Sequence, residues 1–139
     1  MSRDVAAAIF VSPNYGINNT LAPLLTLPAV RYWLPLLMGR QRSIQVWSAD
    51  HEMYWTTTYP LVAVLPMAAL VDRVSRMDVS KASVPVLFWI PSEDEVVRPD
   101  LTAQVADRWG GPADVQFVTL KVEGDPRSHN IAGDIRSPD

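Results

Sequence analysis

The sequence predicts an α/β fold with a mostly parallel sheet of about three strands. Three short apolar runs, residues 5–11, 84–90 and 115–122, have the length and composition of strands. Helical patterns lie between these runs. Because strands that alternate with helices usually form parallel sheets, we expect one α/β domain over residues 1–139.

Each apolar run ends at residues that stop a strand. Residues 5–11 are continuously apolar and are followed by "SPNYG", which predicts a fully buried strand. Residues 84–90, "VPVLFWI", have the same character and stop at "PSED". Residues 115–122, "VQFVTLKV", alternate more clearly and stop at "EGDP". These runs are the predicted strands of the sheet.

Two helices are predicted beside these strands. In the first, between the second and third strands, Leu101, Val105 and Trp109 repeat at helical spacing after Pro99, and a Gly-Gly pair suits its end. The other helix precedes the second strand and contains Pro66, which predicts a kink. Its apolar residues share one face: Leu61, Val64, Leu65, Ala68, Val71 and Val74.

Residues 18–60 differ in character from the rest of the chain. Three prolines interrupt an apolar stretch that also holds three of the five tryptophans. These residues are Pro23, Pro28, Pro35, Trp33, Trp47 and Trp55. The pattern predicts short helices and loops that cover another part of the molecule, and it does not predict a sheet element.

Composition excludes several classes of function. The 12 basic and 15 acidic residues are scattered and give a net charge of −3, which argues against partners such as nucleic acid or an anionic membrane. The absence of cysteine excludes disulfides, thiolate metal sites and cysteine nucleophiles. No apolar stretch approaches the roughly 20 residues that span a bilayer, and the N-terminus does not resemble a signal peptide. We therefore expect a cytoplasmic protein that is not an integral membrane protein.

The loops after the three predicted strands carry the candidate site. Right-handed crossovers bring these loops to one edge of a parallel sheet, where ligands usually bind. His129 follows the third strand and Asp94 follows the second, so the two can form the base and the orienting acid of nucleophilic catalysis. Glu93 and Glu95 are alternatives for the acid. A solvated surface histidine is the other interpretation of His129.

Other kinds of site have weaker support. His51 and Glu52 lack a second histidine four residues on, so the zinc-protease pattern fails, and we expect no metal. The glycines do not form a phosphate-binding loop, and we expect no cofactor. Asn14, Tyr15, Trp33 and Trp55 are candidates for substrate contacts, although aromatic residues more often belong to a core.

The segments "VPVLFWIPSEDEVVRPD" and "DPRSHNIAGDI" resemble the C-terminal part of the α/β-hydrolase family. In that family a loop of the form D-x-V-V-x-P carries the triad acid, and Asp94 matches the acid while His129 matches the histidine. Residues 18–83 are similar to the lid or cap inserted before the acid strand. The resemblance implies a partial α/β-hydrolase fold and a lysophospholipase-like or esterase activity on a small ester or lipid-like substrate.

The sequence departs from the family at the nucleophile. The family needs a serine in a G-x-S-x-G turn, and none of the serines has that frame. Ser12 follows a strand, but Pro13 fits neither the helix nor the oxyanion N–H that the turn requires. We therefore expect the chain to supply the acid and histidine, to lack the nucleophile half, and to be inactive alone.

The resemblance also implies an unpaired strand edge. If the three strands are the last of a longer sheet, residues 5–11 expose an apolar edge that invites association. The chain would then associate with a missing N-terminal half or with itself. The alternative function is a non-catalytic α/β interaction module that binds a partner through this edge.

Overall fold

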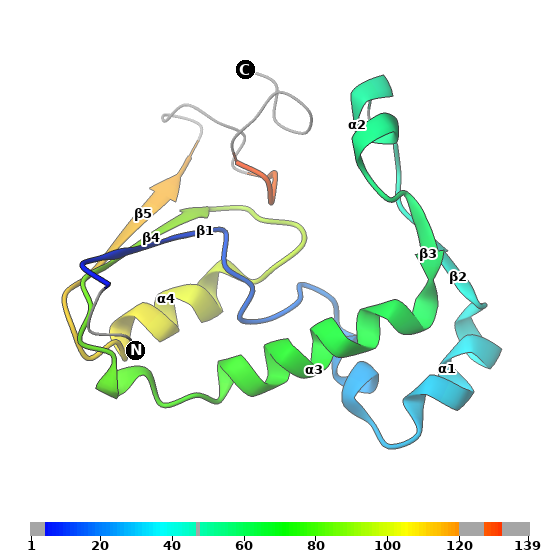
Figure 1. The fold of residues 1–139 in the computed structure, drawn as a ribbon, viewed down its shortest axis with the longest axis horizontal. Helices are drawn as coiled ribbons and strands as arrows, with labels where there is room; N and C mark the ends of the chain where they lie inside the picture. The colour runs from blue at the N-terminus through cyan, green and yellow to red at the C-terminus, as the bar shows by residue number, and fades with distance from the viewer. Residues whose placement is uncertain (1–4, 47, 120–126, 132–139) are drawn as a thin grey trace.

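The computed structural model describes residues 5–46, 48–119 and 127–131. Its main sheet has three parallel strands in the order β1, β4, β5 (Figure 1). They are β1 Ala8–Val11, β4 Val86–Pro91 and β5 Ala113–Val118. The predicted mixed α/β fold with a parallel sheet is thus confirmed.

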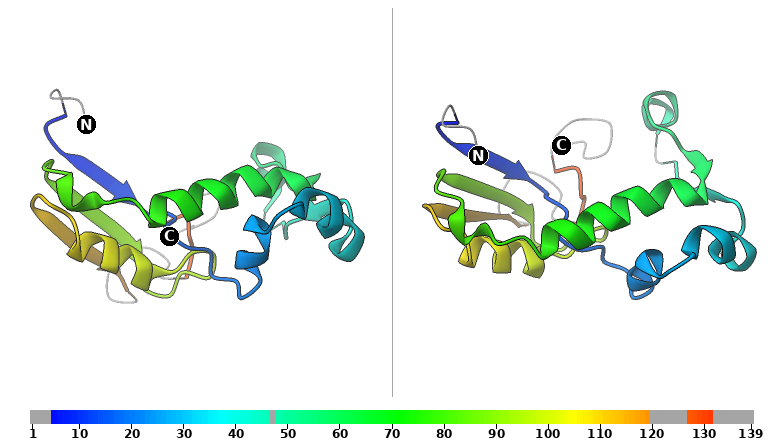
Figure 2. Two further views of the ribbon diagram at one scale, coloured as in Figure 1. Left: turned by 90° about the horizontal axis from the view of Figure 1, so that it is seen from below. Right: turned by 60° about the horizontal axis from the view of Figure 1, so that its bottom comes forward.

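The hydrophobic core lies on one face of this sheet. Phe10 of β1 pairs with Phe88 of β4, which pairs with Val115 of β5, so these side chains line the same face. Helix α4 Pro99–Asp107 covers that face, and α3 Val64–Ser75, which extends beyond the sheet, reaches the core through Val74 near its C-terminal end (Figure 2). Buried residues at the centre are Tyr15, Val86, Phe88, Val105 and Ala106, with Val74, Leu101 and Trp109 packed against them.

The strand bounds differ from the predicted ones. β1 begins at Ala8, and Ile9 and Val11 are 66% and 50% exposed, so the prediction of a fully buried strand was wrong. The reason is that Ile9 and Val11 lie on the sheet face opposite Phe10, together with the exposed Asp114 and Gln116 of β5, so the core on the Phe10 face does not cover them. β4 begins two residues later than predicted and β5 two residues earlier, while residues 120–122 of the predicted third strand lie outside the described residues.

Residues 18–63 contain short elements at the end of α3 away from the sheet (Figure 1). The helical ones are η1 Ala22–Thr26, α1 Val30–Met38, α2 Ala49–Tyr54 and η2 Leu61–Ala63. The prediction of no sheet element was wrong, because β2 Gln41–Ser43 pairs antiparallel with β3 Thr58–Pro60. A hydrogen bond of 3.0 Å joins the hydroxyls of Ser43 and Thr58 across this pair.

Helices α1 and α3 each continue past a proline; at Pro66 the sequence predicted a kink. Pro66 is the third residue of α3, in the first turn, where backbone N–H groups have no helical partner, and α3 runs unbroken to Ser75. Pro35 lies inside α1. The predicted apolar face of α3 is confirmed, since Val64 and Ala68 are buried. A short turn, η3 Val79–Lys81, then leads into β4.

No helix in the described ranges combines the length and apolar character needed to cross a bilayer.

Candidate active site

The acid loop, residues 92–98, connects β4 to α4 at the carboxyl edge of the sheet. Asp94 lies in this loop with a fully buried side chain. Its Oδ1 accepts hydrogen bonds from the backbone N–H of Val96 at 2.7 Å and of Val97 at 2.9 Å. An aspartate that binds the backbone two and three residues later closes a tight turn, so the carboxylate is held rigidly against its own loop.

His129 completes the pair from the segment that follows β5. Its Nδ1 lies 2.9 Å from Oδ2 of Asp94, and 27% of its side chain is exposed. The neighbouring Arg127 carbonyl accepts from the N–H of Glu95 at 3.4 Å, which also holds this segment to the acid loop. The buried acid thus lies behind an imidazole that is partly open to solvent.

Two opposing effects act on the pKa of Asp94. Burial of the carboxylate raises the pKa, whereas hydrogen bonds from His129 and from the N–H groups of Val97 and Val96 lower it. The hydrogen bonds outweigh burial, so the pKa of Asp94 lies below its ordinary value of 3.8. Asp94 is therefore ionised at neutral pH.

An ionised Asp94 determines what the imidazole can do. A carboxylate only accepts hydrogen bonds, so Nδ1 of His129 must carry a proton. In the neutral ring, Nε2 then has the free lone pair and can take a proton from another group. This arrangement is that of an oriented general base.

The two glutamates beside Asp94 have different environments. Glu93 is exposed and its Oε2 lies 3.2 Å from Nε of Arg127. Glu95 is also exposed. Of the three acids that the sequence left open, Asp94 is the one whose carboxylate contacts the ring of His129. The catalytic role of this contact stays a prediction.

Ser12 ends β1 at the same edge of the sheet. It is buried, its φ is 44°, and its Oγ has no hydrogen-bond partner among the described residues. Its N–H donates to the carbonyl of Trp89 at 2.9 Å. A nucleophile turn needs a helix directly after the serine, and the next helical element begins only at Ala22. The prediction that Ser12 is not the nucleophile stays untested.

The predicted substrate contacts lie in separate places. The side-chain amide of Asn14 donates to the sulfur of Met67 at 3.8 Å. Met67 and Trp55 both line an open hollow of about 590 Å³ beside α2 and η2. Trp33 donates from Nε1 to the carbonyl of Pro28 at 3.2 Å. Asn14 thus contacts one of the residues that line this hollow with Trp55, whereas Trp33 makes a local contact within its own segment.

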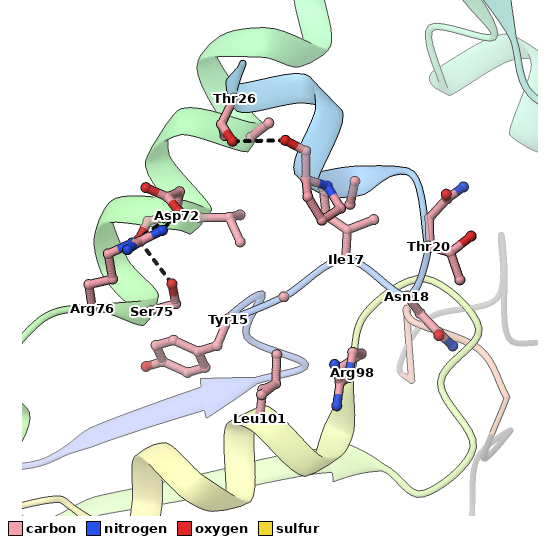
Figure 3. Close-up of a pocket in the computed structure, with 16 residues that line it drawn as sticks. Tyr15, Ile17, Asn18, Thr20, Thr26, Asp72, Ser75, Arg76, Arg98 and Leu101 are labelled. Carbon is pink, nitrogen blue, oxygen red and sulfur yellow. Dashed lines mark hydrogen bonds and ion pairs between the residues drawn. The ribbon is translucent and has the colours of Figure 1, made fainter. Parts of the chain in front are cut away.

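Tyr15 belongs to the core and to a second cavity. Its ring packs on Phe88 with 6.5 Å between centroids, and burial raises the pKa of its hydroxyl. The cavity, of about 580 Å³, lies between α3, η1 and the start of α4 (Figure 3). Its charged lining includes Arg76, which pairs with Asp72 at 2.6 Å, so the cavity wall carries little unbalanced charge on that side.

Sequence reasoning missed a set of contacts that hold the acid loop from outside. The side-chain amide of Asn18 donates to the backbone carbonyl of Asp94 at 3.1 Å. The N–H of Asn18 donates to the carbonyl of Val96, and the N–H of Arg98 donates to the carbonyl of Gly16, both at 2.9 Å. No sequence pattern predicts such contacts between loops, because they depend on where the ends of two strands lie in the folded sheet.

In the described part of the chain, no group of three or more His, Asp or Glu side chains is placed to hold a metal ion. The expectation of no metal and no cofactor remains an expectation.

Comparison of the chain with known protein families, with curated proteins and with solved structures finds no match.

Proposed function

We propose that this chain supplies the acid and the histidine of a serine hydrolase that acts on small ester or lipid-like substrates. The contact of 2.9 Å between Nδ1 of His129 and Oδ2 of the buried Asp94 carries the proposal. In this function the nucleophilic serine comes from a segment outside these 139 residues. The partial α/β-hydrolase fold is part of the same proposal.

The proposed chemistry is acyl transfer. Nε2 of His129 takes the proton of the serine hydroxyl while the serine oxygen bonds to the carbonyl carbon of the ester. The protonated ring then gives that proton to the leaving alcohol as the carbon–oxygen bond breaks. Asp94 stays ionised, keeps the ring in the correct tautomer and stabilises the imidazolium. A water molecule repeats these steps to release the acid.

The outer edge of β1 supports a partner that carries the serine. Ala8 donates its N–H to the carbonyl of Pro85, just before β4, and Ser12 donates its N–H to the carbonyl of Trp89 in β4. In a parallel strand alternate residues direct their backbone groups to opposite sides, so Ile9 and Val11 direct theirs away from β4. A nucleophile-bearing strand that pairs there would end at the same edge of the sheet as Asp94 and His129.

The direct experiment expresses the chain together with the protein segment encoded upstream of it, where that segment carries a G-x-S-x-G turn. This product is the joined protein. Hydrolysis of p-nitrophenyl esters is then measured for the joined protein and its variants. His129→Ala and Asp94→Asn are expected to lower kcat/KM by about four orders of magnitude, because members of a triad act as a unit.

Glu95→Gln is the matched control, since it removes an exposed carboxylate next to Asp94 in the same loop. Its rate should stay within about twofold of the unmodified protein, because exposed charges contribute little. An unchanged rate in His129→Ala would refute the proposed function.

A second candidate is a non-catalytic interaction module. The observation that favours it is the open backbone edge of β1, the outer strand of the sheet, because strand addition pairs with such an edge. In this case substitution of His129 or Asp94 would leave binding of the partner chain unchanged, whereas substitutions on β1 would weaken it.

A further inference from the structure

Asn18 is the one side chain of the loop after β1 that is bonded to the main chain of the acid itself. Its Nδ2 donates to the backbone carbonyl of Asp94 at 3.1 Å, and Figure 3 shows the side chain extending toward the loop between β4 and α4. A carbonyl oxygen only accepts, so the amide must present its nitrogen here. The contact therefore needs a side-chain donor at position 18.

The main chain of Asn18 strengthens this contact. Its N–H donates to the carbonyl of Val96, and residues Ile17 and Val97 form an antiparallel bridge next to it. Asn18 thus binds the carbonyls of Asp94 and Val96. Both belong to the turn in which the Asp94 carboxylate accepts hydrogen bonds from the N–H groups of Val96 and Val97. Any residue can form the backbone bond, whereas the bond to the Asp94 carbonyl depends on the side chain.

We propose that Asn18 is a positioning residue that fixes the Asp94 turn and so holds the acid against His129. The inference rests on the proposed function, because its purpose is the orientation of the base. The carboxylate is tied to its own backbone by the N–H groups of Val96 and Val97, so holding that backbone holds the carboxylate. Asn18 touches neither the ring nor a reacting atom in this role.

Nuclear magnetic resonance of the 139-residue chain tests the inference without turnover. In Asn18→Ala, amide hydrogen exchange at Val97 should become about fivefold faster, which corresponds to about 1 kcal/mol for one lost hydrogen bond. The Nδ1–H proton resonance of His129, which reports the bond to Asp94, should weaken in the same variant. Asn19→Ala is the control and should leave both signals unchanged, because Asn19 binds only Leu21 and Ala22 in the described contacts.

A second pair of variants keeps the shape of the side chain. Asn18→Asp is isosteric but places an acceptor against the Asp94 carbonyl, so it should change both signals in the same direction as Asn18→Ala. Asn19→Asp adds the same charge one residue away and keeps the acceptor for the N–H of Leu21. Wild-type exchange at Val97 and a wild-type His129 resonance in both Asn18 variants would overturn the inference.

The joined hydrolase separates this inference from the proposed function. Asn18→Ala should lower kcat about fivefold with KM unchanged, because Asn18 acts through Asp94 and not on the substrate. If the unmodified protein shows no hydrolysis, the proposed function fails while the resonance measurements still decide the role of Asn18. Normal kcat together with altered resonance signals would show that Asn18 stabilises the loop without affecting catalysis, and would overturn its role as a positioning residue.

Discussion

At the scale of single residues, side-chain length separates Asp94 from its acidic neighbours. The short aspartate folds back onto the N–H groups of Val96 and Val97 and still offers Oδ2 to His129. Glu93 reaches outward to Arg127 instead. One loop therefore holds a buried acid and a solvated one side by side.

The lowered pKa of Asp94 predicts a pH-dependent stability. A carboxyl group whose pKa is depressed by folding contributes stability that is fully present above its ordinary pKa of 3.8 and is lost as the pH falls through the folded pKa. Asp94→Asn should therefore cost about 2 kcal/mol of unfolding free energy at neutral pH, and this difference should vanish in strong acid. Urea unfolding across the acid range measures it.

Glu93→Gln is the control for this measurement, because its carboxylate is exposed in an ion pair and such pairs contribute little. A difference between Asp94→Asn and the unmodified protein that stays constant down to strong acid would contradict the assigned hydrogen bonds.

The residue-scale site was partly predictable from sequence. Strand ends and the D-x-V-V-x-P pattern led to Asp94 and His129, and these two are in contact. The left-handed backbone of Ser12 was not predictable, because serine carries no preference for positive φ. The Asn18 contact was not predictable either, since it joins loops 76 positions apart.

At the scale of elements, the two glycines after α4, Gly110 and Gly111, do not end the helix. They allow the backbone before β5 to pack closely against the backbone of residues 80–83. The helix already ends at Asp107, and a Cβ on Gly110 would overlap the backbone carbonyl of Ser80. The N–H of Gly110 also donates to the carbonyl of Val79 at 3.1 Å. The turn before β5 is thus packed directly against η3 and needs residues without side chains.

Gly110→Ala should lower the unfolding free energy by about 2 kcal/mol, because the added methyl group meets backbone that cannot move alone. Gly16→Ala is the comparison, since its Cβ would meet the end of the flexible Leu101 side chain. The Gly16 variant should be the less damaged of the two in urea unfolding. Equal losses would contradict the importance of the Ser80 contact.

Elements with a strong apolar pattern were predictable and weakly patterned ones were not. β4 and the apolar face of α3 were found from composition and spacing. β2 and β3 were missed because each has three residues and neither shows apolar alternation. Pro60 at the end of β3 also argued against a strand there.

At the scale of the whole molecule, the chain exposes more surface than a compact protein of its mass. Its accessible area is 9609 Å², whereas a compact monomer of 15.5 kDa has roughly 7,200 Å². Several exposed apolar side chains lie on β1 and α1. The most exposed of these side chains are Ile9, Tyr32, Leu36 and Leu37.

The open edge of β1 predicts concentration-dependent association. Light scattering after size exclusion should give a mass above that of the monomer as concentration rises. The double substitution Ile9→Thr with Val11→Thr keeps strand-forming residues and should shift the mass toward the monomer. Leu36→Ser with Leu37→Ser removes apolar surface from α1 and should have a smaller effect.

A monomer at every concentration would contradict self-association through the open edge of β1. The fold class at this scale was predictable from the alternation of strands and helices. The placement of α1, β2, α2 and β3 at the far end of α3 was not, because it depends on tertiary packing between weakly patterned elements.

The strand register has a consequence for the order of folding. Ala8 pairs with Val86, whereas Val86 pairs with Ala113, so the first pairing closes a loop roughly three times as long as the second. Shorter loops close first, and β4, α4 and β5 should therefore form a nucleus before β1 joins it. Because Asp94 lies within that nucleus, we expect the Asp94 turn to form early in folding. The hydrogen bonds from Asn18 would form later, when β1 pairs with β4 and brings Asn18 next to this turn.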